Sequence, residues 1–188
     1  MLEGGRSSLK LSATALAIGF LPGTIAGLLV SRGPARLRDL VSEAAGLWFA
    51  LPLIVVSLIV ARTFDSDFWP LALCFGLHAF MLALRATASL AEYRTAPWRQ
   101  IRAWAPLAGA AAVAGTTAIL GQTTLSYFGL ADPFGVTWGS DIGRANSTVV
   151  GNHWASWSPF VAVLISASGF LLIRTSLDDV DPPRMYER

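Results

Sequence analysis

Charged residues are scarce in this chain, and they are missing altogether from five long apolar stretches. Only 14% of the 188 residues are Asp, Glu, Lys or Arg, and 54% are hydrophobic; soluble domains usually carry about 25% charged residues. A soluble fold of this size has too little interior to cover so much apolar surface. A lipid bilayer accommodates it, because the hydrocarbon itself acts as the solvent. The composition therefore indicates a membrane protein.

Cysteine and histidine are almost absent, which argues against several classes of function. Cys74 is the only cysteine, so no disulfide can form within the chain. His78 and His153 fall in different segments, no carboxylates pair within a span, and no phosphate-cradling glycine loop occurs. The acidic residues at 178–181 are interpreted as a solvated tail rather than a cation site. We expect no enzyme, metal or cofactor, and a net charge of +2 is too small to indicate nucleic acid binding.

Five uncharged stretches approach the length of about 20 residues that a membrane-spanning helix needs. They are 11–30, 46–61, 69–84, 104–125 and 155–173. We predict an all-α fold: a single domain, 1–188, forming a polytopic membrane bundle of about five transmembrane helices. The second and third stretches are short, so four spans are an alternative, and the first stretch could instead be a cleaved signal peptide. Pro22 and Pro52 lie in mid-span and predict kinks.

The arginines predict an orientation. Segments 31–45, 85–103 and 174–188 hold three, four and three basic residues, and the opposite side holds four. By the positive-inside rule, the first side is cytoplasmic. We therefore expect a multi-pass membrane protein with its amino terminus outside, a tryptophan-containing external loop at 126–154 and a cytoplasmic tail at 174–188.

The fourth stretch is distinctive because 108–118 consists almost entirely of small residues, which let another helix approach closely. Uncharged hydrogen-bonding side chains follow in the outer half of this helix. They are Thr116, Thr117, Gln122, Thr123, Thr124 and Ser126. Such groups either line a path for a polar solute or form hydrogen bonds between helices. His78, midway along the third stretch, has the same two interpretations.

The segment 123–140 resembles a signature near the end of the permeases of dipeptide, oligopeptide and nickel ABC importers. Its matching residues are Leu125, Ser126, Tyr127, Phe128, Gly129, Leu130, Trp138 and Gly139. The tail at 177–182 also resembles the terminus of that family, and weaker similarity covers most of the chain, including Leu51-Pro52-Leu53 and Arg85. The similarity begins after the first span of that family.

The resemblance implies a translocation path between this chain and a second permease subunit. It also implies two cytoplasmic ATPase subunits and an external solute-binding protein as partners. The family's coupling loop would correspond to 85–106, which is shorter here by about two to three helical turns. The candidate ATPase-coupling residues are Arg85, Glu92, Tyr93, Arg94, Arg99 and Arg102. Alternatively, 92–102 is a solvated connection whose arginines only determine the orientation of the chain in the membrane.

Two functions follow as expectations. The first is a transmembrane subunit of an ABC importer for peptides or related small solutes. The second is a degenerate permease retained as a non-transporting scaffold or accessory subunit, with subunits of another membrane complex as its partners. In both cases the bilayer surrounds the chain, and neither function identifies a solute.

Overall fold

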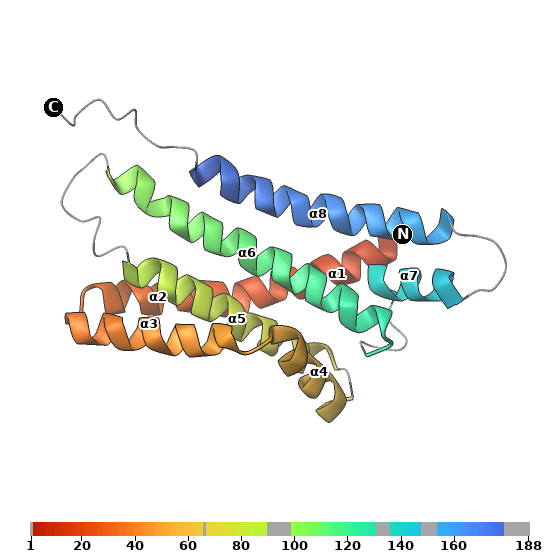
Figure 1. Cartoon of the computed structure of the whole chain (residues 1–188), viewed down its shortest axis with the longest axis horizontal. Helices are drawn as coiled ribbons and strands as arrows, with labels where there is room; N and C mark the ends of the chain where they lie inside the picture. Colours follow the sequence, from red (N-terminus) through yellow and green to blue (C-terminus); the bar gives the residue numbers. More distant parts are fainter. Residues whose placement is uncertain (1, 66, 90–98, 131–135, 148–153, 179–188) are drawn as a thin grey trace.

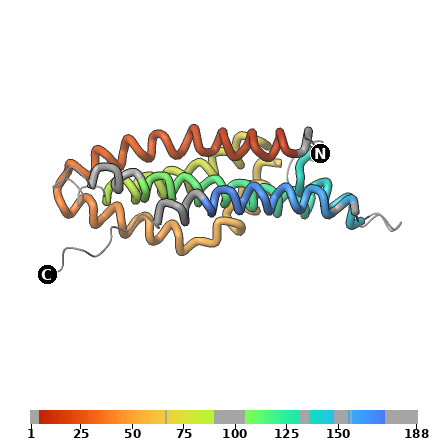
Figure 2. The backbone as a smooth tube through the Cα atoms, turned by 90° about the horizontal axis from the view of Figure 1, so that it is seen from above, coloured from red at the N-terminus to blue at the C-terminus, as the bar shows by residue number. Residues whose placement is uncertain are grey.

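The chain folds into an elongated bundle of helices that run roughly along one long axis (Figures 1 and 2). The computed structural model describes residues 2–65, 67–89, 99–130, 136–147 and 154–178, and these residues contain helices and no strands. The predicted all-α fold is confirmed for this part of the chain. The amino terminus lies at the end of the bundle where α7 is found, and α8 leads back toward the opposite end (Figure 1).

The first helix is continuous from Leu2 to Ser31. It consists of α1 (Leu2–Ala15), a π-helical turn η1 (Leu16–Phe20) and α2 (Leu21–Ser31). Pro22 follows the π-helical turn and stands near the start of α2, where a missing N–H is tolerated. The predicted kink at Pro22 therefore takes the form of a wide turn without a break.

The second predicted span is interrupted. Helix α3 (Ala35–Ala50) ends before Leu51 and Pro52, α4 (Leu53–Thr63) begins after them, and the two helices are bent by 71°. Proline disfavours the helical conformation in the preceding residue, and Leu51 is extended at ψ 127°. The predicted kink at Pro52 is confirmed, and it is strong enough to divide the predicted span 46–61 between two helices.

The remaining predicted spans all lie within helices. They are α5 (Phe68–Ala88), α6 (Arg99–Tyr127) and α8 (Trp154–Asp178). Pro106 and Pro159 lie inside α6 and α8, respectively. The predicted external loop 126–154 contains a further helix that the sequence analysis did not predict, α7 (Trp138–Ser147). Part of the predicted tail continues α8 to Asp178.

Among the residues that the structure describes, two helices are long and apolar enough to cross a membrane, namely Gly5–Ser31 and Phe68–Ala88. The bent pair α3–α4 supplies a third if it acts as one span. In the 18-residue apolar part of each helix, 22% of the residues are buried in Gly5–Ser31 and 56% are buried in Phe68–Ala88. Helix α5 is therefore central, whereas the first helix leaves most of its surface exposed.

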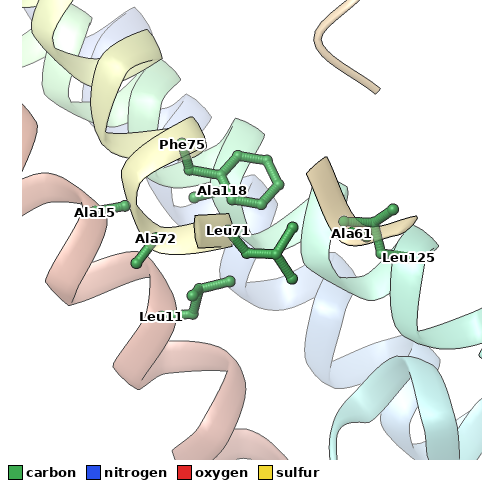
Figure 3. Close-up of a cluster of buried hydrophobic side chains, with 8 residues drawn as sticks. All are labelled: Leu11, Ala15, Ala61, Leu71, Ala72, Phe75, Ala118 and Leu125. Carbon is green, nitrogen blue, oxygen red and sulfur yellow. The ribbon is translucent and has the colours of Figure 1, made fainter. Parts of the chain in front are cut away.

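A cluster of buried apolar side chains forms where α1, α4, α5 and α6 meet (Figure 3). Leu11, Leu71, Phe75 and Leu125 fill its centre and are each at most 3% exposed. Small residues surround them, including Ala118 of the small-residue segment of α6. The sequence predicted that another helix approaches this segment closely, and Ala110, Ala112, Ala114 and Ala118 are accordingly buried within the bundle.

Glycines let α2 and α5 pack at very close range. Gly19, Gly23 and Gly27 recur every fourth residue and therefore share one face of the helix. A Cβ atom on Gly19 would overlap the backbone of Gly76, and one on Gly27 would overlap the Thr87 hydroxyl. Small residues at this spacing are typical of closely packed membrane helices. The four-residue spacing of these glycines is visible in the sequence, but the sequence analysis did not predict this packing.

Candidate functional site

The signature residues Leu125–Leu130 form the corner that ends α6. Gly129 adopts a left-handed conformation, with φ of 69°. Its N–H donates to the Ser126 carbonyl at 3.1 Å, and the Leu130 N–H donates to the Leu125 carbonyl at 2.8 Å. This pair of bonds is a Schellman motif, and Leu130 also packs against the cluster that contains Leu125. The glycine is required because other residues adopt this conformation at a cost.

Helix α7 begins with a reciprocal cap. The Ser140 N–H donates to Thr137 Oγ1 at 3.1 Å, and the Thr137 N–H donates to Ser140 Oγ at 2.9 Å. These two bonds satisfy backbone donors that the first turn of a helix leaves free, as in a capping box. Thr137 is buried, so the start of α7 is held inside the fold rather than in solvent.

Helix α7 then packs back against the bundle through the remaining signature residues. A Cβ on Gly139 would overlap the Thr123 carbonyl and would lie 2.8 Å from Ser126 Cβ. Trp138 is 7% exposed and lies against Gly5 of α1. The segment therefore joins α1, α6 and α7 at the amino-terminal end of the bundle.

The threonines of α6 satisfy their hydroxyl groups locally. Thr116, Thr117, Thr123 and Thr124 each donate to the carbonyl four residues earlier, at 2.7 to 2.9 Å. Neither an open path nor hydrogen bonds between helices are needed to satisfy these donors. Thr116 is buried, Thr117 and Thr123 are half-buried, and Thr124 is exposed, so the four side chains do not share one face.

Three other polar groups are buried without a hydrogen-bond partner in the described part of the chain. They are Ser8 Oγ, Gln122 Oε1 and Ser126 Oγ. Buried polar atoms are normally paired, so these atoms retain hydrogen-bonding capacity. Nearby, Ser12 Oγ donates across to the Gly115 carbonyl of α6 at 3.4 Å. Sequence reasoning identified Gln122 and Ser126 but missed Ser8 and Ser12, since isolated serines in an apolar stretch carry little signal.

His78 connects α5 to α3. Trp48 Nε1 donates to His78 Nδ1 at 3.3 Å, and the Phe49 ring meets the imidazole edge-on, with centroids 5.5 Å apart. Because Nδ1 accepts a hydrogen bond, the ring proton of neutral His78 is placed on Nε2. This arrangement positions His78 as a bridge between helices, away from the polar residues of α6.

Arg85 lies at the opposite end of the bundle from the signature corner. Its guanidinium carbon is 6.0 Å from the centroid of the Phe49 ring. The exposed side chain borders a hollow of about 380 Å³ that Arg38 and Asp39 also line. A second hollow of about 440 Å³ lies between Arg85 and the start of α6, beside Pro106.

The other candidate coupling residues are only partly described. Arg99 and Arg102 lie in the first turns of α6. Glu92, Tyr93 and Arg94 lie outside the described residues. Among the described residues, no group of three or more His, Cys, Asp or Glu side chains is placed to hold a metal ion. The free Cys74 is buried in α5.

Comparison with known proteins gives no family. No protein-family model matches the chain, and no curated protein matches it. The function of this chain is therefore inferred from its residues and their arrangement in the structure.

Proposed function

We propose that this chain is a permease-like transmembrane subunit of an ABC importer for peptides or related small solutes. The observation that carries the proposal is the signature segment, whose eight residues form a capped corner closed by α7 at the end opposite Arg85. Motif residues that together form one compact structural unit support the proposal better than residues scattered over the surface would. The resemblance to peptide and nickel permeases thus extends to residues with a common structural role.

The proposed membrane arrangement has five spans. The first helix, α5 and α8 run in one direction along the bundle, and α3 and α6 run in the other (Figure 1). The polar turn after α2, the end of α5 and the start of α6 lie at the arginine-bearing end, which would face the cytoplasm across a bacterial inner membrane. The amino terminus and α7 would lie outside.

The proposed solute path lies beside this chain rather than through it. The apolar cluster fills the centre of the bundle, so a second permease subunit would supply the other wall. Thr117, Leu120 and Thr124 recur on one side of α6 and are half-buried, 43% exposed and exposed, respectively. That stripe is the part of α6 available to a neighbouring subunit. Gln122 and Ser126 would contribute only after a movement of α1 or α7.

The proposed ATPase contact surrounds Arg85. The two hollows beside it join α3, α5 and the start of α6, so a protein bound there would move three helices together. Arg38 and Arg85 supply positive charge that suits acidic side chains on a cytoplasmic partner. This contact would replace part of the shortened coupling loop.

Co-isolation from native membranes tests the proposal. We expect the tagged full chain to retain a pair of ATPase subunits, and Arg85→Glu to lower the recovered ATPase at least several-fold. Arg62→Glu is the matched control, because Arg62 ends α4 toward the other end of the bundle. Recovery of a different membrane assembly, with no ATPase in either sample, would refute the importer function.

A scaffold or accessory subunit of another membrane complex is the second candidate. The observation that favours it is that all four α6 threonines donate their hydroxyl hydrogens to their own helix, so none of these donors is left for a solute. The His78–Trp48 bond also holds α3 and α5 together. For this candidate, we expect deletion of the gene to leave solute uptake unchanged and to destabilise the partner complex.

A further inference from the structure

An open groove runs between α1, α7 and α8 at the amino-terminal end of the bundle. It has a volume of about 770 Å³ and is lined by Leu9, Ala13, Trp138 and Ala162, together with Gly5 and two basic residues. The volume exceeds by far the roughly 30 Å³ that a water molecule occupies in the liquid. The lining is almost wholly apolar, so the groove suits a ligand with a long hydrocarbon part.

The two basic residues are Arg6 and Lys10. They stand four residues apart, so both lie on the side of α1 that borders the groove. Both are exposed, and no ion pair joins either of them to another described residue. The Lys10 ammonium lies 5.3 Å from the centroid of the Phe68 ring at the start of α5. The cations therefore border an apolar groove at the level where the helices begin.

We propose that this groove binds a phospholipid with a net negative charge. One acyl chain would lie along Ala13 and Ala162, and the phosphate would lie between Arg6 and Lys10. Trp138 suits the boundary between headgroup and acyl chain, because its ring is apolar and its N–H is polar. Long basic side chains reach headgroups readily while their stems remain against apolar surface.

Charge decides between a lipid and a protein helix as the occupant. An apolar helix in the groove would cover Arg6 and Lys10 without supplying counter-charges, and a buried unpaired charge is strongly unfavourable. An anionic headgroup supplies the counter-charge at the same position. The proposal depends on placing the chain in a membrane and is independent of solute transport.

Lipid binding to the purified full-length chain tests the proposal. The protein is delipidated in detergent, equal amounts of phosphatidylglycerol and phosphatidylcholine are added, and bound lipids are counted by native mass spectrometry. We expect one retained phosphatidylglycerol with at least a fivefold preference over phosphatidylcholine. The double variant Arg6→Gln/Lys10→Gln should reduce this preference to nearly one.

Two further variants separate this site from general charge effects. Arg62→Gln removes one charge near the same end of the molecule and should keep the preference. Ala162→Trp fills the groove and should abolish retention of both lipids, while circular dichroism checks that each variant remains helical. An unchanged preference in the double variant, an equal loss in Arg62→Gln, or a polypeptide crosslinked through position 9 would overturn the proposal. None of these results depends on ATPase partners.

Discussion

Single glycines determine how closely the helices of this bundle approach one another. Gly139 has the Thr123 backbone and the Ser126 side chain against it, whereas Gly169 has no atom within 4 Å of the position of a Cβ. The same substitution at these two helical positions therefore has opposite consequences. At the first it forces two elements apart, and at the second it adds a methyl group in open space.

We expect Gly139→Ala to lower the free energy of unfolding by about 1–3 kcal/mol, because the added methyl group cannot be accommodated without backbone movement. Gly169→Ala is the control and should raise it by up to about 1 kcal/mol, since alanine favours the helix. Unfolding by sodium dodecyl sulfate in mixed micelles, followed by circular dichroism, measures both. Equal stability of the two variants would show that α7 does not depend on this contact.

For the polar side chains of α6, the sequence predicts the capacity to form hydrogen bonds but not the hydrogen-bond partners. Their hydrogen-bonding character was correctly recognised, but the sequence left a path and a helix contact equally open. The threonines bond to their own helix, which any helical threonine can do. Whether Gln122 or Ser126 has a hydrogen-bond partner depends on the side chains that α1 and α7 place beside them. Helix α1 is more than 100 residues away in the sequence, so local sequence patterns around Gln122 cannot predict this contact.

At the level of helices, the position of Pro52 explains the largest departure from a straight bundle. Its ring prevents Leu51 from continuing α3, and its own carbonyl accepts the N–H groups of Val55 and Val56 at the start of α4. Pro22 has no comparable effect, because the preceding π-helical turn keeps the helix continuous. The local backbone conformation around each proline therefore determines whether the helix is interrupted.

We expect Pro52→Ala to straighten the α3–α4 junction. Spin labels at positions 40 and 59, both exposed, would move apart by several ångströms toward the ~28 Å of a straight helix of that length. Double electron–electron resonance on a Cys74→Ala background measures the distance. Pro22→Ala is the control and should leave it unchanged. If Pro52→Ala also leaves it unchanged, packing against α5 imposes the bend.

Considered as a whole, the molecule has two chemically different ends. Gly129 and α7 mark one end, and Arg85 with the turn after α2 marks the other. The sequence predicts that the arginine-bearing end faces the cytoplasm, and the opposed ends of the bundle make this prediction easy to test with one label at each end.

We expect a membrane-impermeant maleimide to label Phe128→Cys from outside intact spheroplasts and Arg36→Cys only after inversion or lysis. Both positions are exposed, and the buried native Cys74 is replaced by alanine in both variants. The physical reason is that arginine-rich segments are retained on the cytoplasmic side. Labelling of Arg36→Cys alone from outside would reverse the proposed orientation, and labelling of both from outside would exclude the odd number of spans that the proposal places between them.

The order of residues along the chain was sufficient to predict the long apolar helices and their approximate ends, the close packing of the small residues of α6 and the bend at Pro52, but not α7. These features depend on neighbours within a few residues: uncharged apolar runs, proline geometry and local side-chain size. The packing of α7 against α6, the bridge from Trp48 to His78 and the groove beside Arg6 and Lys10 were decided only by the tertiary structure. Each of these features depends on contacts between helices that are far apart in the chain, and no local sequence pattern predicts such contacts.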